Sequence, residues 1–230
     1  MTPTTEQILA LLYPKSRKCA VCEKEFTELA VRKSKLKTPT KIDTDFLSHY
    51  KEIDPNHYEV IFCIYCGYAA LMANFDVITQ RQRDILLAEI GKNHKPVEFD
   101  APYSLEMVVT RYNQAMKCAT AINAKASIKA FIALKLSWVL RVAGKHDLEK
   151  KFSRMAYDGL VEAYSDERFP LGNMDETTAK YIIADLARRN GLMGEAMRWV
   201  ADVVVAKGIP SAIKEKASLL KDMIREGNTK

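Results

Sequence analysis

Cys19-Ala-Val-Cys22 and Cys63-Ile-Tyr-Cys66 are two Cys-x-x-Cys pairs that hold four of the five cysteines in the sequence. A thiolate pair at this spacing grips one side of a tetrahedral metal ion, and a second pair completes the coordination. The sequence therefore predicts one metal site with these four ligands, and we favour Zn2+ as a structural cofactor. Gly67 follows the second pair, where glycine permits a positive φ angle, whereas Glu23 follows the first.

Other uses of these cysteines are open at this point. Iron also suits four thiolates in tetrahedral geometry, and the sequence does not separate it from zinc. A thioredoxin-like dithiol enzyme is disfavoured because there are two pairs and no βαβ alternation. Disulfides are disfavoured because the cysteine count is odd and the first residues lack a signal-peptide pattern. We therefore expect a cytoplasmic protein.

The charge of the chain is concentrated beside the metal motif. The 230 residues are 48% apolar and carry a formal charge of +6, with no apolar run of membrane-spanning length, so we expect a globular protein with no membrane contact. Between Lys15 and Lys41 there are nine Lys and Arg against three acids. This excess of positive charge could contact the phosphates of a nucleic acid. It is equally expected for a solvated hairpin, whose charges keep its edge strand from pairing with another sheet. The candidate nucleic-acid contacts are Arg32, Lys33, Lys35 and Lys37.

Five residues with metal-binding or acid–base chemistry lie between the two Cys-x-x-Cys pairs. A second metal site, a catalytic acid–base set and support of the cysteine turns are three readings of this group. Turn formation is the interpretation we favour, because Asp54-Pro55 starts turns and aspartate caps them. The group comprises Asp43, Asp45, His49, Asp54 and His57.

A proline-containing stretch, Lys95 to Tyr103, is the expected domain boundary. Before it, residues 1–95 are expected to form a zinc-ribbon-like head with short β-strands, at 26–36 and 59–62, and a trailing helix. Glu6 to Leu12 is expected to be a lead-in stopped by Pro14, and the chain is expected to turn helical from Tyr68. A capping box at Thr79 predicts the start of the trailing helix.

Residues 103–230 are expected to form a helical domain. Ser104, Ser127 and Asp175 are the expected helix starts, and Gly144 and Gly191 each end a helix before a short turn and another helix. This arrangement, with small residues such as Ala184 and Ala196, resembles a degenerate tetratricopeptide repeat. A plain helical bundle is the alternative. The fold class predicted is mainly α.

The whole pattern resembles a bacterial family known as domain of unknown function 2225. The resemblance is carried by Cys19-x-x-Cys22-x-x-x-Phe26, Arg32-Lys33-Ser34-Lys35, Asp43-Thr-Asp45-Phe46, Asp54-Pro55 and Cys63-x-x-Cys66-Gly67-Tyr68-Ala69, with Trp138, Tyr181 and Arg188-Arg189-x-Gly191 further on. It implies a cytoplasmic bacterial protein with a zinc-ribbon-like head and tetratricopeptide-like helices. It implies no particular activity.

The function predicted is that of a zinc-stabilised adaptor whose helices bind a protein or peptide partner, because helical repeats build concave surfaces. Nucleic-acid binding by the basic head is the first alternative. An enzyme that uses Asp43, Asp45 and His49 is the second, and it is disfavoured because the sequence contains no P-loop, dinucleotide fingerprint, HExxH or GxSxG motif.

Overall fold

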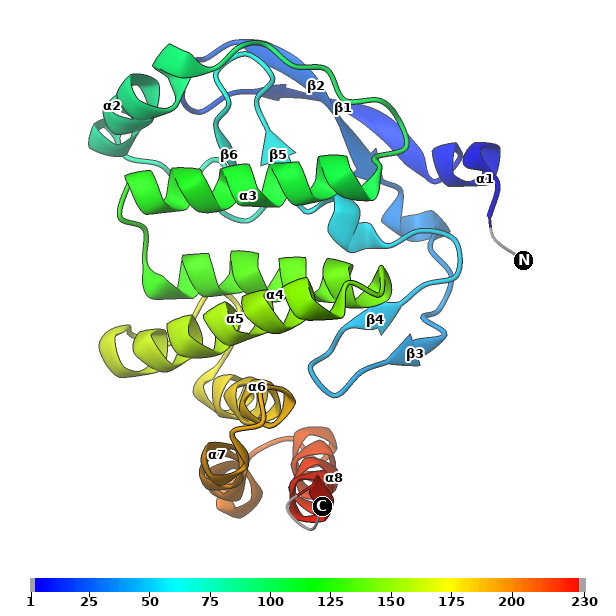
Figure 1. Cartoon of the computed structure of the whole chain (residues 1–230), viewed down its shortest axis with the longest axis vertical. Helices are drawn as coiled ribbons and strands as arrows, with labels where there is room; N and C mark the ends of the chain where they lie inside the picture. Colours follow the sequence, from blue (N-terminus) through cyan, green and yellow to red (C-terminus); the bar gives the residue numbers. More distant parts are fainter. Residues whose placement is uncertain (1–2, 228–230) are drawn as a thin grey trace. The chain divides into compact units, whose positions relative to one another are not determined.

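The computed structural model describes residues 3–227, which fold into two compact units. The first unit contains the chain up to Lys41 and then Ser48–Ala124. The second contains the short segment Ile42–Leu47 and the chain from Lys125 onward. Figure 1 colours the chain from blue to red, so strands dominate the blue and cyan part and helices the rest. The mainly α fold class expected from the sequence is confirmed.

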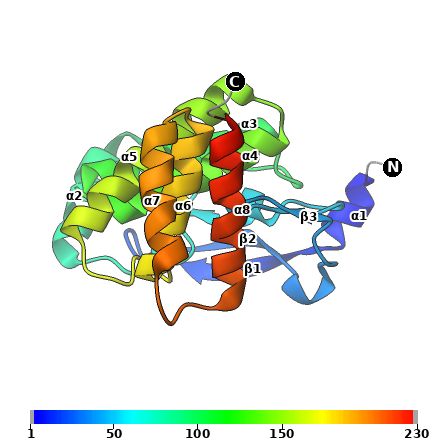
Figure 2. The same cartoon turned by 90° about the horizontal axis from the view of Figure 1, so that it is seen from below.

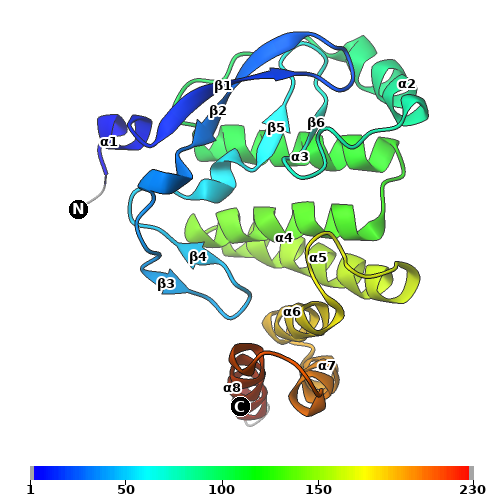
Figure 3. The same ribbon diagram turned by 180° about the vertical axis from the view of Figure 1, so that it is seen from behind.

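Two antiparallel hairpins and a long helix build the first unit. The register of the first hairpin pairs Leu12 with Val31 and Lys18 with Glu25. The second pairs Val60 with Leu71. Figures 1 and 3 both show the first hairpin over the second, with α3 on the far side of the second. The elements are α1 (Thr5–Leu9), β1 (Leu12–Lys18), β2 (Glu25–Val31), η1 (Lys33–Lys35), β3 (Lys41–Ile42), β4 (Ser48–His49), η2 (Pro55–Tyr58), β5 (Val60–Phe62), β6 (Ala69–Leu71), α2 (Gln80–Glu89), η3 (Gly91–Asn93) and α3 (Leu105–Ala121).

Two strands of this unit correct expectations from the sequence. Pro14 does not stop the chain, because β1 runs through it. Proline is tolerated there because β1 has β2 as its only neighbour, so the missing N–H can lie on the unpaired edge. Tyr68 does not start a helix either, because Ala69–Leu71 is strand β6. The helix caps lie where they were expected: Thr79 forms a capping box at the start of α2, and Ser104 caps α3 by accepting a bond from the Met107 N–H at 3.3 Å.

The units divide near residue 124, not in the proline-containing stretch Lys95 to Tyr103. Phe99 packs edge-on against Phe62 with ring centroids 5.0 Å apart, and Tyr103 stacks on Tyr58 at 4.9 Å. The aromatic side chains thus fix the stretch to the first unit. Helix α3 then packs on β5 and β6 and belongs to the same unit.

A buried ion pair links the strands of the first unit to α3. Glu28 on β2 is 4% exposed and pairs with Arg111 on α3. Glu28 also accepts a bond from the Phe62 N–H at 3.1 Å, and Arg111 donates to the Val60 carbonyl at 2.6 Å. The ring of Tyr103 lies 4.4 Å from the guanidinium. Because burial opposes the charged form, the pKa of Glu28 is raised despite the arginine.

The second unit consists mainly of antiparallel helical hairpins. Gly144 and Gly191 end the first helix of each hairpin with φ angles of +67° and +76°, a conformation that glycine adopts freely. Figure 2 shows α6, α7 and α8 side by side, consistent with their mutual packing. The helices are α4 (Ala126–Val142), α5 (His146–Asp166), α6 (Glu176–Arg189), α7 (Met193–Val205) and α8 (Ser211–Gly227).

Of the helix starts expected here, one differs from the expectation. Asp175 caps α6 by accepting a bond from the Thr178 N–H at 2.7 Å, as expected. Helix α4 starts one residue before Ser127, which is itself inside the helix. The Ser127 hydroxyl donates to Glu167 at 2.6 Å and so binds the end of α5 instead of capping α4.

Candidate metal centre

Each Cys-x-x-Cys pair sits in the turn of one β-hairpin. The first pair lies between Lys18 and Glu25, which close the β1–β2 ladder. The second lies between Phe62 and Ala69, which close the β5–β6 ladder. The turns of both hairpins belong to the first unit. In that unit the four cysteine sulfur atoms lie close together.

The two turns share one backbone geometry. The Cys19 N–H donates to the Lys24 carbonyl at 3.0 Å, and the Cys63 N–H donates to the Tyr68 carbonyl at 2.8 Å. The residue after each pair is left-handed, with φ of +62° at Glu23 and +70° at Gly67. The positive φ expected at Gly67 is therefore present, and Glu23 adopts it at the cost that a side chain imposes there.

The spacing of the four sulfur atoms fits a single metal ion. All four Sγ atoms lie within 4.8 Å of one another. The Sγ atoms of Cys19 and Cys66 are 3.7 Å apart, and those of Cys22 and Cys63 are 3.6 Å apart. A tetrahedral site with metal–sulfur bonds of about 2.3 Å requires sulfur atoms about 3.8 Å apart. All five cysteines are free thiols, because a disulfide requires sulfur atoms only about 2 Å apart.

The thiols also perturb one another electrostatically. Hydrogen bonding to Cys63 raises the pKa of Cys19 to about 12, and hydrogen bonding from Cys19 lowers the pKa of Cys63 to about 2. The pKa of Cys66 is raised, chiefly by hydrogen bonding to Cys19. The first negative charge in the cluster thus opposes further ionisation, which is the repulsion that a bound cation relieves.

Helix α3 braces the second turn with two side chains that the sequence did not mark as site residues. Gln114 donates to the Gly67 carbonyl at 2.8 Å. Cys118 lies 3.6 Å from the same oxygen, and its sulfur accepts a bond from the Ala69 N–H at 3.4 Å. Sequence reasoning had no ground to include Cys118, because the spacing of residues within α3 does not indicate that this helix contacts β6.

His94 and Arg83 complete the surroundings of the cysteine turns. The His94 ring is within 3.0 Å of the Ile64 carbonyl, inside the second turn. Arg83 on α2 donates to the Val21 carbonyl at 2.8 Å, inside the first turn, and pairs with Glu23. Each turn is therefore held from outside by a polar side chain that does not belong to the cysteine quartet.

The group of five acid and histidine residues is divided between the two units. Asp43 and Asp45 fall in the Ile42–Leu47 segment of the second unit, whereas His49, Asp54 and His57 belong to the first unit. Asp54 accepts a bond from the Asn56 N–H at 2.9 Å and starts η2, which confirms its expected turn role. Among residues 3–227, the cysteines form the only cluster of three or more His, Cys, Asp or Glu that suits a metal ion.

Asp43 and Asp45 both bind one arginine. Arg141 on α4 donates to Asp43 at 3.0 Å and to both Asp45 oxygens, at 3.0 and 2.7 Å. The Trp138 indole adds a bond to Asp45 at 2.9 Å. Burial would raise the pKa of Asp45, but these bonds and the charge of Arg189 outweigh it, so this pKa lies below its ordinary value.

The residues beside these aspartates bind α6. The Thr44 hydroxyl donates to Asp185 at 2.7 Å, and the Tyr181 hydroxyl donates to the Thr44 carbonyl at 2.8 Å. The Phe46 and Tyr181 rings lie 5.3 Å apart. The four central residues of the segment Ile42–Leu47 are thus held by side chains from α4 and α6.

The four candidate nucleic-acid contacts have different surroundings. Arg32 donates to the Leu12 carbonyl at 3.2 Å and covers the Tyr13 ring at 5.1 Å. Lys37 forms an ion pair with Glu52 at 2.7 Å. Lys33 and Lys35 extend from η1, where both are exposed. Arg32 and Lys33, but not the other two, line a pocket of the first unit.

The fold and the cysteine geometry define a class: mainly α-helical proteins with a four-cysteine, metal-type centre in a strand-bearing unit. Over residues 12–229 the chain matches the family described as "Uncharacterized protein conserved in bacteria (DUF2225)", and it belongs to that family. No curated protein and no solved structure matches it. None of the helices in the described part of the chain has the length and apolarity needed to cross a bilayer.

Proposed function

We propose that the four cysteines hold one structural Zn2+ in a zinc-ribbon-like arrangement. The two matching hairpin turns and the sulfur spacing support this assignment, and a site filled by four protein ligands leaves no open position for substrate. The free thiols favour a cytoplasmic location, where thiols stay reduced. Elemental analysis of the purified protein should give one zinc per chain. One iron per chain, or no metal at all, would overturn the assignment.

The second unit is proposed to bind a protein or peptide, which makes the protein an adaptor. Its repeated helical hairpins suit a tetratricopeptide-like layer. The observation that carries the proposal is a hollow of about 520 Å³ on α7, lined by Glu195, Arg198, Trp199, Ala201 and Asp202. Tryptophan and arginine are the commonest anchors at protein interfaces, and here both face one hollow.

The walls of this hollow are held in place from behind. The Trp199 ring packs edge-on against Tyr164 with centroids 4.9 Å apart. Lys180 lies 3.2 Å from Glu176 and 3.8 Å from Asp202. A prearranged aromatic wall with charges of both signs at its rim suits a peptide that carries one apolar anchor.

An enzymatic role receives less support than a binding role. Asp43 and Asp45, the acids singled out for acid–base chemistry, are both engaged by Arg141. An arginine partner keeps a carboxylate ionised and occupies its lone pairs, which disfavours proton transfer at neutral pH.

The adaptor proposal is tested by selecting binders from a displayed library of random peptides on the zinc-loaded full chain. Selected peptides should bind Trp199→Ala at least tenfold more weakly, as measured by calorimetry. Leu148→Ala, an exposed apolar change on α5, should leave binding unchanged and serves as the matched control. Asp202→Lys tests the rim without altering the ring packing. Equal binding to all variants, or no enriched peptide, would contradict the proposal.

Nucleic-acid binding by the first unit is a second candidate, favoured by the presence of Arg32 and Lys33 in the lining of one pocket. Binding of random single-stranded RNA should weaken steeply with salt, since phosphate contacts release counterions. Reversing the charges of Arg32, Lys33 and Lys35 should abolish it. Reversing Lys37 should matter less, because that lysine already pairs with Glu52. Unchanged binding in the triple variant would remove this candidate.

A further inference from the structure

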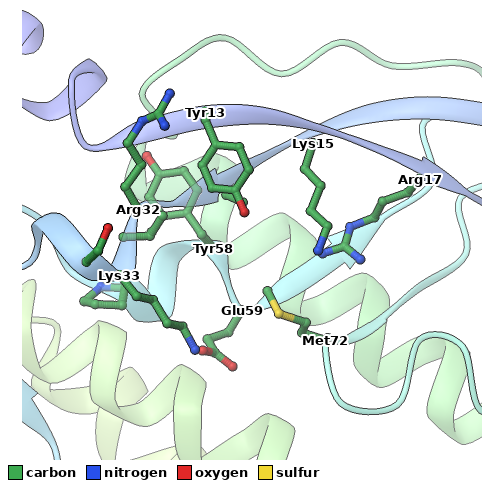
Figure 4. A pocket seen from close by; sticks show the side chains of 12 residues that line it. Tyr13, Lys15, Arg17, Arg32, Lys33, Tyr58, Glu59 and Met72 are labelled. Atoms are coloured by element: carbon green, nitrogen blue, oxygen red, sulfur yellow. The ribbon is translucent and has the colours of Figure 1, made fainter.

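A basic pocket opens between the two strands of the first hairpin and η2, apart from the cysteine cluster. Its volume is about 440 Å³. That size is ordinary for a small-molecule site. Figure 4 shows the side chains of Tyr13, Lys15 and Arg17 extending from β1 to one side, with Glu59 and Met72 below them. The pocket is lined by Tyr13, Lys15, Arg17, Ala30, Val31, Arg32, Lys33, Ser34, Pro55, Tyr58, Glu59 and Met72.

Four cationic side chains line this pocket, and Figure 4 shows the ends of Lys15 and Arg17 side by side. Tyr13, Lys15 and Arg17 alternate along β1 and therefore share one face of the strand. Arg32 and Lys33 enter from the end of β2 and the start of η1. Glu59 is the one acid in the lining. Like charges repel, so this arrangement favours an anion between them.

Arg17 shares the nearby acid Glu28 with a second arginine. Glu28 faces Lys15 across the ladder, but it is engaged by Arg111 and the Phe62 N–H. The Nε atom of Arg17 is shut off from solvent and has no hydrogen-bond partner within the part of the chain that the structure describes. An unpaired buried donor is costly, and a bound anion removes that cost.

One wall of the pocket suits a flat or apolar group. The Tyr13 ring is flanked by the Arg32 guanidinium at 5.1 Å. Tyr58, which is 3% exposed, forms part of the floor, and Met72 and Pro55 add apolar surface. A site with convergent cations on one side and an aromatic wall on the other matches a ligand with a phosphate and a planar ring.

We propose that the basic pocket binds a nucleoside phosphate, with Lys15, Arg17 and Lys33 at the phosphates and Tyr13 and Met72 beside the base. This site is independent of the peptide-binding proposal for the second unit. It shares Arg32 and Lys33 with the nucleic-acid candidate, and the chemistry recognised, a phosphate joined to a base, also occurs at each position of a single strand. The experiment must therefore separate a free nucleotide from a strand.

The test is calorimetry at low salt on the zinc-loaded full chain, with ADP, inorganic pyrophosphate and a single-stranded RNA dodecamer as probes. ADP should bind more tightly than pyrophosphate, because only ADP carries a base for the aromatic wall. Binding of the dodecamer without binding of ADP would overturn the proposal in favour of nucleic acid. Equal affinity for ADP and pyrophosphate would overturn the role of Tyr13 and Met72, and no binding of any probe would overturn the site.

Variants of lysines inside and outside the pocket lining test whether ADP binds in the pocket. Lys15→Gln and Lys33→Gln should each weaken ADP binding about tenfold or more, because each removes a charged donor. Lys18→Gln on β1 and Lys35→Gln on η1 remove the same charge from exposed positions outside the lining, and should have little effect. Tyr13→Leu should weaken ADP but not pyrophosphate. If Lys18→Gln weakened ADP binding as much as Lys15→Gln, and Lys35→Gln as much as Lys33→Gln, ADP would be bound by diffuse electrostatic attraction. That result would overturn the proposal that ADP binds in the pocket. Lys15 is exposed, so its variant tests the site without loss of folding.

Discussion

Arg141 holds Asp45 through two parallel hydrogen bonds, Nη1 to Oδ1 at 3.0 Å and Nη2 to Oδ2 at 2.7 Å. Asp45 is fully buried, and its second oxygen also accepts the Trp138 indole N–H. Paired charges of this kind satisfy each other in a low dielectric, and the loss of one leaves the other uncompensated. The contact therefore makes Ile42–Leu47 part of the second unit.

Asp45→Asn is expected to destabilise the second unit by about 1.5–3 kcal/mol, because Arg141 and Arg189 lose a buried charged acceptor, although Arg141 keeps Asp43 and Glu149 as partners. Urea unfolding followed by tryptophan fluorescence measures this, since Trp138 contacts the mutated group. Asp158→Asn is the control: Asp158 pairs with Arg154 on the surface of α5. Its loss should cost at most about 1 kcal/mol. Equal effects of the two changes would contradict the structural role of Asp45.

The same carboxylate predicts a pH dependence. Its pKa is lowered in the folded state, so its contribution is present above the ordinary aspartate value of 3.8 and is lost as the pH falls through the lower folded value. The difference in unfolding free energy between the parent and Asp45→Asn should therefore be constant at neutral pH and shrink in acid. A difference that grows in acid would show that Asp45 is protonated in the folded protein.

Cys63→Ser or Cys66→Ser should unfold the first unit, because structural zinc supplies roughly 10–16 kcal/mol in small modules. Limited proteolysis should then cut within residues 1–41 and 48–124 and spare the helices from Lys125 onward. Cys118→Ser is the control. A serine hydroxyl can keep the contacts to the Gly67 carbonyl and the Ala69 N–H, so the cost should not exceed about 1–3 kcal/mol. Protease resistance equal to that of the parent in the Cys63 and Cys66 variants would exclude a structural metal.

Reaction with a disulfide reagent tests whether Cys118 is buried in the core of the first unit. Burial raises the pKa of Cys118 to about 11, so its thiol stays protonated at neutral pH. With the metal in place, Cys118 should react with a disulfide reagent only on unfolding of the first unit. Chelation, which unfolds this unit, should then make Cys118 react as fast as the other four thiols. Rapid reaction of Cys118 with the metal still in place would show that α3 does not hold it in the core.

Gly67→Ala should weaken the metal site. A Cβ atom at Gly67 would lie 2.5 Å from the His94 ring nitrogen, and the φ of +70° adds strain for any side chain. Gly144→Ala shares the positive φ but meets no atom within 4 Å, so it isolates the backbone cost of about 1 kcal/mol. We expect competition with a chelator to show weaker zinc binding for Gly67→Ala only. Equal zinc affinity in both variants would contradict the packing of His94 on the turn.

A chain of residues 125–230 alone should be unstable, because Arg141, Arg189 and Asp185 lose the segment they bind. A synthetic peptide of residues 40–49 should raise its melting temperature, since a ligand that binds only the folded state stabilises it. The same peptide with Asp45→Asn should have little effect. Full stability of the chain without any peptide would show that Ile42–Leu47 is dispensable.

Features that depend on residues close together in the sequence were predictable. Contacts between elements far apart in the sequence were not. The cysteine spacing predicted the quartet, and the caps at Thr79, Ser104 and Asp175 lie where the sequence places them, because such signals act within a few residues. Strand β1 was missed because Pro14 normally argues against a strand, and only its place beside a single neighbour explains it. The place of α3 in the first unit depends on its packing against β5 and β6, which no periodicity within α3 reports.

The contacts of Asp43 and Asp45 are a second example that the sequence does not predict. Their spacing and turn-forming chemistry suggested a site near the cysteines, whereas the structure binds them to Arg141. No local signal relates an aspartate to an arginine 96 residues later. Glu28 and Arg111, 83 residues apart, were missed for the same reason.

The segment Ile42–Leu47 also sets the order in which the polypeptide can mature on the ribosome. Thr44 leaves the exit tunnel long before Tyr181 and Arg189, which follow 137 and 145 residues later. At about 5–20 residues per second, the wait is about 7–30 s. During this interval Ser48–Ala124 can already fold around the cysteines, while Phe46 and its neighbours stay exposed to chaperones. Completion of the second unit thus has to wait until α6 has emerged.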